Sequence, residues 1–375
     1  MIKNIVILCG GQNVEHDVSL MSASNVIRDL DTERFTKTIV YITRSGQWLL
    51  VTQEDTFLKQ AKELCVDTTL LSPLLLQPGN PTRPLVIQQS GQGIHVDCIF
   101  PVLHGSLAED GTLQGLLEVL GVPYVGCDTM SSAVCMEKHI VKQLLQHSGI
   151  PTLPWITMHV SEKDNYTYTG IAEQVAPIFF MKTVKSGSSI GVYKIRNEAE
   201  YREAIDAIFN FDHYIIIEKA VVARELEVSV LGNTTPQATV PGEVIVFDDF
   251  YSYDAKYFNA AGSRTESPAK ISDTLAKTLQ QLAIVTFKAL RCCGMARIDF
   301  LAVSDDEYYL NEINPLPGFT DISMYPKNWA ASELTYSQLI TTLIELAEET
   351  HAGRLRVLTG CQQFVTDKRA QYSES

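Results

Sequence analysis

The chain has 375 residues, of which 45% are hydrophobic and 20% are charged, proportions that are typical of a folded globular protein. This length predicts two or three domains rather than a single core. The formal net charge of −14 argues against a nucleic-acid partner or an anionic membrane surface, and no apolar stretch is long enough to span a bilayer.

The N-terminal sequence, MIKNIVILCGG, predicts a buried strand, and it lacks the hydrophobic region and cleavage site of a signal peptide. The 8 cysteines are scattered and include no C-x-x-C pair. Buried free thiols are therefore expected rather than disulfides or a zinc site. These features predict a cytoplasmic protein.

Residues 1–127 are predicted to form a Rossmann-like domain with a parallel sheet. Apolar runs at 3–9 and 39–42 predict strands, and the apolar spacing over 18–30 predicts a helix between them. Ligands of such sheets bind beyond the carboxyl ends of the strands. Gly10 and Gly11 occupy that position, but the residues after them break the G-x-G-x-x-G pattern, so NAD binding is not expected. Glu15 precedes the helix, where it either complements the helix dipole or contacts the ammonium group of a ligand.

The second half of this domain begins with a proline-punctuated segment, 52–92, in which no chemistry is visible. A strand is predicted at 96–104 and a helix at 113–120. His104 lies at the end of that strand beside a glycine-rich loop, which is a typical position for a binding residue. The alternative is a structural histidine with satisfied hydrogen bonds.

A central unit is predicted over 128–221. It begins with a helix over 131–148, on which Lys138 and Lys142 share a face that is either functional or simply solvated. Strands at 177–182 and 192–195 flank a loop of small residues, whose N–H groups and hydroxyls suit a cover over phosphates. The loop is not a Walker A motif, and a plain hairpin tip is the alternative. Strands at 214–219 and 221–231 follow, and Glu225 and Glu227 on the second are either part of a nucleotide hinge or an ordinary strand rim.

The third unit, 222–350, contains an aromatic-rich segment from 248 to 262 that is long for a loop and predicts a lid. Helices are predicted at 275–292 and 333–347. The tail, 351–375, has no clear period, and we expect it to be partly disordered.

The most informative stretch is a predicted hairpin with strands at 296–303 and 308–315. Residues two apart in a strand share a face, so Arg297 lies beside Asp299, and Glu312 beside Asn314. If the two faces coincide, their oxygens suit a hard cation such as Mg2+ bound to phosphate, and the guanidinium suits a phosphoryl group or an oxyanion. The alternative is a solvated face whose charges pair with one another.

Taken together, these segments resemble the D-alanine–D-alanine ligases of the ATP-grasp superfamily. The resemblance runs from about residue 1 to 347, is poor over 52–92, and does not cover the tail. It rests on five segments in the expected order: GGQNVEHDVS (10–19), HGSLAEDGTLQG (104–115), KSGSSIG (185–191), YDAKY (253–257) and NEINPLPGFT (311–320). It implies an α/β fold, in which a Rossmann-like, pre-ATP-grasp domain is followed by a two-lobed α+β ATP-grasp fold.

The resemblance also implies how ATP is bound. Asp299, Glu312 and Asn314 are expected to hold two Mg2+ or Mn2+ ions against the phosphates. Glu218 is expected to meet the adenine amino group, and Glu225 the ribose hydroxyls. The other nucleotide-binding residues that it implies are Lys138, Lys182, Ser189, Lys219, Val221 and Lys256.

For the substrates, the resemblance implies that the carboxylate of one D-alanine is phosphorylated and then attacked by the amine of a second. Arg297 and the N–H of Gly318 are expected to form the oxyanion site. Glu15 is expected to anchor the first ammonium group, with His104 nearby, and to bond with Ser188 and Tyr257 across the closed lid. Ser323 and Met324 are expected to contact the second substrate. D-Alanine and ATP are the implied partners, and a homodimer without nucleic acid or membrane is expected.

Four alternatives remain open on the sequence alone. The Lys256–Tyr257 pair favours an amine acceptor over D-lactate, whereas D-serine is less well excluded. A non-catalytic ATP-binding module would be expected to lose a metal ligand, and all three are present. A dehydrogenase is disfavoured by the broken glycine pattern.

Overall fold

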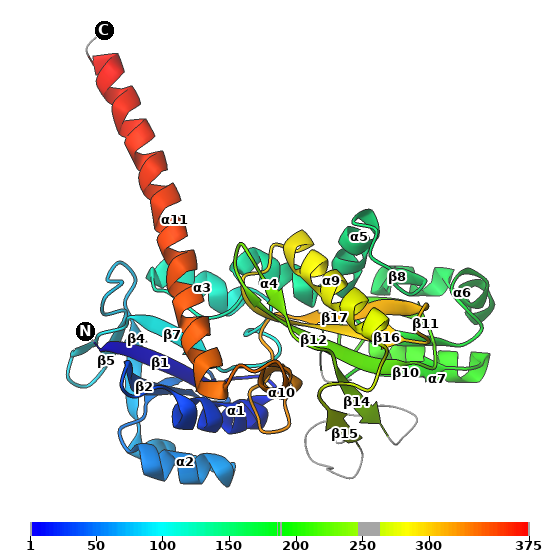
Figure 1. Cartoon of the computed structure of the whole chain (residues 1–375), viewed down its shortest axis with the longest axis horizontal. Helices are drawn as coiled ribbons and strands as arrows, with labels where there is room; N and C mark the ends of the chain where they lie inside the picture. Colours follow the sequence, from blue (N-terminus) through cyan, green and yellow to red (C-terminus); the bar gives the residue numbers. More distant parts are fainter. Residues whose placement is uncertain (1, 186, 188–189, 247–262, 374–375) are drawn as a thin grey trace.

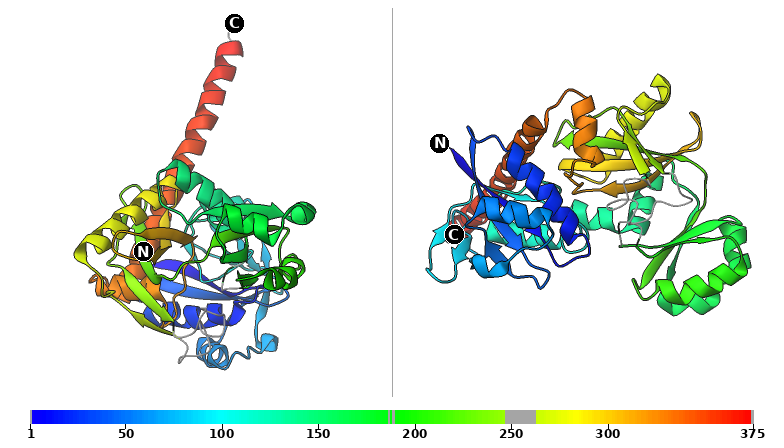
Figure 2. Two further views of the ribbon diagram at one scale, coloured as in Figure 1. Left: turned by 90° about the vertical axis from the view of Figure 1, so that its right-hand side faces the viewer. Right: turned by 90° about the horizontal axis from the view of Figure 1, so that it is seen from below.

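The computed structural model describes residues 2–185, 187, 190–246 and 263–373. The chain forms three lobes, each built around its own sheet, and one long helix that projects from the molecule (Figures 1 and 2). No described helix has both the length and the apolar composition that crossing a membrane requires.

The first lobe contains a seven-stranded sheet in the order β6-β5-β4-β3-β2-β1-β7. Its strands are β1 (Lys3–Gly10), β2 (Phe35–Ile42), β3 (Trp48–Leu50), β4 (Ser72–Leu76), β5 (Leu85–Ile87), β6 (Gly93–Ile94) and β7 (Cys98–Pro101). Its helices are α1 (His16–Asp29), α2 (Glu54–Lys62), the 3-10 turn η1 (Thr68–Leu70) and α3 (Thr112–Leu120).

The predicted parallel arrangement is confirmed for the three strands at one end of this sheet, where β1 pairs in parallel with both β2 and β7. The strands from β3 to β6 pair antiparallel instead. They lie in and beside the segment 52–92 that appeared featureless. Strands of two to five residues are too short to show a period of two in the sequence, which is why they were missed.

The second lobe has a four-stranded sheet in the order β10-β9-β11-β8 with helices on one side (Figure 1). Its elements are β8 (Trp155–His159), η2 (Val160–Asn165), α6 (Tyr168–Gln174), β9 (Phe179–Thr183), β10 (Val192–Ile195), α7 (Glu198–Ile208) and β11 (Tyr214–Lys219). The predicted helix over 131–148, which leads into this lobe, is two helices: α4 (Thr129–Met136) and α5 (Lys138–His147). The break is at Glu137, whose ψ of 82° is not helical.

The third lobe contains the predicted hairpin within a sheet ordered β15-β14-β12-β16-β17, with β13 beside β12. Its strands are β12 (Arg224–Gly232), β13 (Gln237–Ala238), β14 (Gly242–Val246), β15 (Ser263–Glu266), β16 (Gly294–Ala302) and β17 (Tyr308–Asn314). Helix α9 (Asp273–Ala289) covers one face of this sheet, and its N-cap is Ser272, whose side chain accepts the N–H of Leu275. Helix α10 (Met324–Ala331) follows the hairpin.

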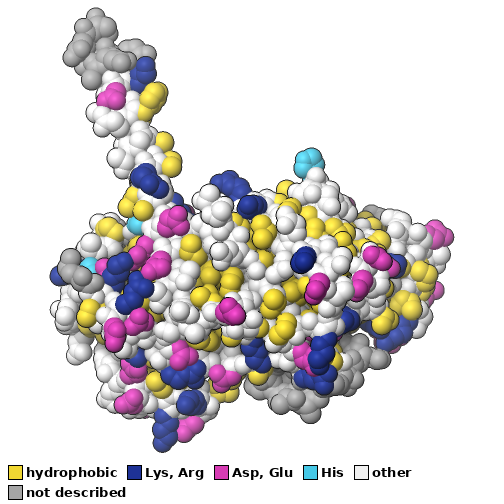
Figure 3. Space-filling model, viewed as in Figure 1, with side chains coloured by type: hydrophobic (Ala, Val, Ile, Leu, Met, Phe, Trp, Pro, Cys, Tyr) yellow, Lys and Arg dark blue, Asp and Glu magenta, His cyan; other side chains and the backbone are white. Residues whose placement is uncertain are grey.

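The last helix, α11 (Tyr336–Ser373), returns to the first lobe. Leu339, Ile340, Leu343 and Ile344 are fully buried in the same core as β1 and β7, so the start of this helix is packed against the N-terminal lobe. Beyond this part the helix projects from the molecule and carries exposed apolar side chains such as Val357 and Phe364 (Figure 3). The expectation of a partly disordered tail is therefore wrong for the described residues up to Ser373, which are helical.

Candidate active site

The hairpin brings its four polar side chains to one face of the third sheet. In the antiparallel pairing of β16 with β17, Arg297 lies opposite Asn314 and Asp299 lies opposite Glu312. Residues directly opposite each other in an antiparallel pair point to the same side of the sheet. A bulge interrupts the pairing directly after Asp299. The predicted coincidence of the two faces is confirmed.

A third strand adds a carboxylate to this face. Glu227 on β12 lies opposite Asp299, and its Oε2 is 3.0 Å from Nε of Arg297. Arg297 also binds both oxygens of Asp299, at 2.8 and 2.7 Å. Burial alone would lower the pKa of Arg297, but Asp299 and Glu227 outweigh it and raise that pKa well above its usual value. The guanidinium is therefore a fixed positive charge at the centre of an acidic face.

These donors fit a hard divalent cation only in part. Among the described residues, no group of three His, Cys, Asp or Glu side chains is placed to hold a metal ion. The hairpin face offers the carboxylates of Asp299 and Glu312 and the amide oxygen of Asn314, which are the ligand types that Mg2+ prefers. Such a short ligand set suits a metal whose coordination is completed by phosphate oxygens and water.

The second lobe contains a buried cluster of opposite composition. Glu218 on β11 pairs through Oε1 with Lys142 of α5, and through Oε2 with Lys182 of β9 at 2.8 Å. Burial opposes the ionised form of Glu218, but the two ammonium groups outweigh it and lower its pKa to about 2. Both oxygens of Glu218 are thus engaged by lysines. The contact of Glu218 with the adenine amino group stays a prediction.

Lys182 links the two clusters. Burial would lower its pKa, but Glu218 outweighs that effect and, together with Glu312 and Glu225, raises it. The ammonium group therefore lies in the field of the hairpin face and of β12 as well as in its own lobe. An anion placed between the second and third lobes would meet this charge.

The first lobe contributes a cluster of carboxylates and an imidazole at the carboxyl ends of its parallel strands β1 and β7. Glu15 and His104 are buried, with 7% and 4% of their surface exposed. A side chain at Gly105 would come within 2.6 Å of Oε2 of Glu15, so that carboxylate lies directly over the Gly105 backbone. Burial lowers the pKa of His104, which favours the neutral ring.

Glu109 belongs to this cluster and was not singled out from the sequence. Its Oε1 accepts the N–H of Gly105 at 3.0 Å and lies 3.9 Å from Nδ1 of His104. Burial, and then the charge of Glu15, raise the pKa of Glu109 to about 8. Its position five residues after His104, within the same glycine-rich motif, was the signal that could have identified it.

The loop after the hairpin approaches the same cluster. A side chain at Gly318 would come within 2.8 Å of Oγ of Ser323 and 4.0 Å of the His104 ring, so a larger residue here would displace the Ser323 hydroxyl. Ser323 Oγ accepts the N–H of Thr320 at 2.9 Å. Met324 is buried at the start of α10. The structure thus brings Glu15, His104, Gly318 and Ser323 together.

The remaining predicted site residues either continue the elements of the second lobe or fall outside the described part of the chain. Lys138 opens α5, Lys219 ends β11, and Val221 lies in the connection to β12. Ser188, Ser189, Lys256 and Tyr257 are outside the described residues.

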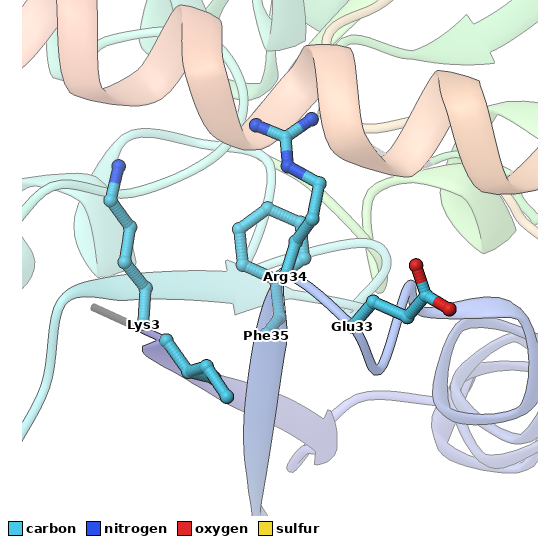
Figure 4. A pocket seen from close by; sticks show the side chains of 5 residues that line it. Lys3, Glu33, Arg34 and Phe35 are labelled. Carbon is cyan, nitrogen blue, oxygen red and sulfur yellow. The ribbon is translucent and has the colours of Figure 1, made fainter.

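A surface hollow of about 360 Å³ lies at the opposite end of the first sheet, between the starts of β1 and β2 (Figure 4). Lys3 and Arg34 extend from it towards α11, where they pair with Glu348 and Glu345, each at 2.6 Å. Because ligands of parallel strands bind at the carboxyl ends, this hollow is a helix-docking feature rather than a substrate site.

Comparison with known proteins agrees with the geometry. The family model for the N-terminus of D-ala D-ala ligase matches residues 4–127, and the model for the C-terminus matches 144–345. The D-alanine–D-alanine ligase A of Salmonella typhimurium is 41% identical over 351 residues, which are 92% of this chain and 96% of that protein.

Two solved structures are similar over nearly their whole length. The D-alanine-D-alanine ligase from Coxiella burnetii superposes with a TM-score of 0.87 at 34% identity, covering 97% of this chain and 99% of that one. The VanG D-Ala:D-Ser ligase from Enterococcus faecalis superposes with a TM-score of 0.84 at 33% identity, covering 92% and 100%. These matches confirm the α/β, ATP-grasp fold expected from the sequence. The chain belongs to the D-alanine–D-alanine ligase family.

Proposed function

We propose that the chain joins two D-alanine molecules into D-alanyl-D-alanine while converting ATP to ADP and phosphate, which supplies a precursor for peptidoglycan. The observation that carries this proposal is the pairing of Asp299 with Glu312 and of Arg297 with Asn314 on one face of the hairpin, in a chain of this family. That face places oxygen ligands and a fixed guanidinium side by side, as phosphoryl transfer followed by acyl transfer requires.

ATP would lie between the second and third lobes. Lys182 would face the phosphates, Asp299, Glu312 and Asn314 would hold the two Mg2+ or Mn2+ ions, and Glu225 on β12 would face the ribose. When bound, the ions would neutralise the charge that develops on the phosphates. Glu218 acts through Lys142 and Lys182, because both of its oxygens are engaged by their ammonium groups. Ser189, Lys138, Lys219, Val221 and Lys256 complete the proposed nucleotide site.

The first step would activate one D-alanine. Glu15 would hold the ammonium group of this D-alanine. A carboxylate oxygen of the D-alanine then attacks the γ-phosphorus of ATP, so that the bond from that phosphorus to the β-phosphate oxygen breaks and ADP leaves. The product is an acyl phosphate, which water would destroy. Closure of the lid over the site, with Ser188 and Tyr257 meeting Glu15, would exclude that water.

The second step would form the peptide bond. The neutral amine of the second D-alanine, held through its carboxylate by Ser323 and contacted by Met324, attacks the acyl carbon. Arg297 and the N–H of Gly318 stabilise the negative oxygen of the tetrahedral intermediate, and each such donor contributes on the order of 3 kcal/mol. The intermediate then breaks its bond to the phosphate oxygen, and the departing phosphate takes up the proton that the attacking nitrogen loses. His104 orders the cluster in which the two substrates meet.

The test is product analysis after incubation with ATP, Mg2+ and D-alanine. We expect D-alanyl-D-alanine, ADP and phosphate in equal amounts, and no phosphate release with L-alanine. ATP binding without D-alanine-dependent turnover would contradict the proposal and favour a non-catalytic ATP-binding module.

D-Serine is the second candidate for the acceptor, because the VanG D-Ala:D-Ser ligase is similar over 92% of this chain. Competition between D-alanine and D-serine in one reaction distinguishes the two. We expect the dipeptide of D-alanine to predominate, and a predominance of D-alanyl-D-serine would reassign the acceptor.

We further propose a cytoplasmic homodimer that acts on small molecules and engages neither nucleic acid nor membrane. The proposed units are a substrate-binding domain (1–127), two ATP-grasp lobes (128–221 and 222–350) and a tail (351–375). The net charge of −14 supports the absence of a polyanionic partner.

A further inference from the structure

Two side chains on helix α1 hold the backbone of one residue in the loop after the hairpin. The N–H of Phe319 donates to Oγ of Ser22 at 3.2 Å, and Nδ2 of Asn25 donates to the carbonyl oxygen of Phe319 at 3.1 Å. Ser22 and Asn25 are three residues apart, so they lie on the same face of α1. Both backbone groups of Phe319 are thus fixed by the first lobe.

The surroundings make this attachment rigid. Ser22 is fully buried and Asn25 is 6% exposed. The hydroxyl of Tyr336 also donates to the Phe319 carbonyl, at 2.7 Å, and the Phe319 ring packs edge-on against Phe100 of β7. The carbonyl of Phe319 thus has two donors, whereas its N–H donates to Oγ of Ser22, so loss of that hydroxyl would leave a buried N–H without this bond.

The attachment lies between two parts of the proposed site. Gly318 immediately precedes Phe319 and follows the strand that carries Glu312 and Asn314. Oγ of Ser22 also lies 3.2 Å from Nε2 of His104. One hydroxyl therefore contacts both the proposed oxyanion loop and the histidine beside it.

We propose that Ser22 and Asn25 are positioning residues, which fix the N–H of Gly318 and the ring of His104 relative to the acyl carbon. This inference rests on the proposed function, because it assigns a role within the same reaction. Neither residue touches substrate. They act by holding the Phe319 backbone, and a displacement of the order of 1 Å at a reacting centre can reduce the rate about 100-fold.

The test compares Ser22→Ala and Asn25→Ala with Ser24→Ala as the matched control. Ser24 lies on the same helix, and its Oγ donates to the carbonyl of Leu20. We expect kcat to fall on the order of 10-fold or more in the two test variants, with the KM for ATP unchanged. The Kd of a phosphinate dipeptide, which mimics the tetrahedral intermediate, should rise by a similar factor. Ser22→Thr, which keeps the hydroxyl, should recover most of the rate.

The possible outcomes distinguish a failure of the positioning role of Ser22 and Asn25 from a failure of the proposed function. If the parent chain is active and both variants keep full kcat and analogue affinity, the positioning role is wrong. A loss of kcat that merely parallels a loss of folded protein, with the analogue affinity unchanged, would also overturn it. A parent chain without D-alanine-dependent turnover would overturn the proposed function and this inference together.

Discussion

The second and third lobes each bury a three-membered ion cluster, and the two clusters have opposite composition. In the third lobe one cation, Arg297, lies between the carboxylates of Glu227 and Asp299. In the second lobe one anion, Glu218, lies between the ammonium groups of Lys142 and Lys182. The first cluster carries an excess negative charge, and the second an excess positive charge.

The difference indicates what each lobe is prepared to bind. A buried cluster with uncompensated charge is costly unless a counter-charge arrives. The excess negative charge of the acidic cluster, to which Glu312 adds, favours the binding of cations. The excess positive charge of the basic cluster around Glu218 favours the binding of phosphate. A nucleotide with divalent ions supplies both, so each lobe provides half of one site. The predictions that follow act on one cluster at a time.

The largest effect is expected from Glu312→Gln on the acidic face. The change removes a metal ligand while keeping the side-chain shape, and we expect kcat to fall on the order of 1,000-fold. Steady-state assays and a thermal melt measure both consequences. The melting temperature should stay close to that of the parent, because glutamine keeps the size and shape of the side chain on β17.

Asp305→Asn at the exposed turn of the same hairpin is the control, and it should leave kcat unchanged. Full activity in Glu312→Gln would contradict the proposal that the hairpin face binds the metal ions.

A smaller effect, on stability, is expected from Glu218→Gln in the basic cluster. The folded-state pKa of Glu218 is lowered to about 2, so its ionised form stabilises the fold above its ordinary pKa, and that stabilisation is lost as the pH falls towards 2. At pH 7 the substitution should cost about 2–3 kcal/mol in the free energy of unfolding. The difference from the parent should shrink between about pH 4.5 and pH 2.

Urea unfolding at pH 7 and pH 3 measures this difference. Glu198→Gln, at an exposed ion pair on α7 of the same lobe, is the control and should show little change at either pH. A pH-independent cost for Glu218→Gln would show that packing, rather than ion pairing, accounts for the loss.

The smallest effect is expected on the KM for ATP, which should differ between variants of Lys142 and Lys182. The Lys142 side chain is 2% exposed and that of Lys182 is 18% exposed, so the lysine with access to a ligand is Lys182. We expect Lys182→Met to raise the KM for ATP about 10-fold, which corresponds to about 1.4 kcal/mol. Lys142→Met should chiefly lower the unfolding free energy. Equal changes in KM for both variants would mean that neither lysine contacts the phosphates in preference to the other.

The sequence predicted the parts of this site that depend on local periodicity. The two strands of the hairpin could be predicted because their polar residues, Arg297, Asp299, Glu312 and Asn314, alternate with apolar ones. A period of two then determines which side chains lie on the same face. Glu225 and Glu227 were placed on one face of their strand for the same reason.

What could not be predicted depends on contacts between distant segments. The bond between Glu227 and Arg297 requires the register of two strands that are far apart in the chain, and no local pattern encodes it. The ion pairs of Glu218 with Lys142 and Lys182 join three separate elements, β11, α5 and β9. The break at Glu137 interrupts a predicted helix whose apolar spacing continues across that residue. The helical tail was missed because its residues beyond the first lobe are not buried, so burial imposes no period on them.

The central claim is that the hairpin face binds divalent ions together with a triphosphate. The most direct measurement is a Mn2+ titration followed by electron paramagnetic resonance, with a non-hydrolysable ATP analogue, on the parent chain and on Glu312→Gln. The account predicts two tightly bound ions per chain for the parent, and the loss of at least one in the variant. Equal numbers and affinities of bound Mn2+ in both proteins would contradict it.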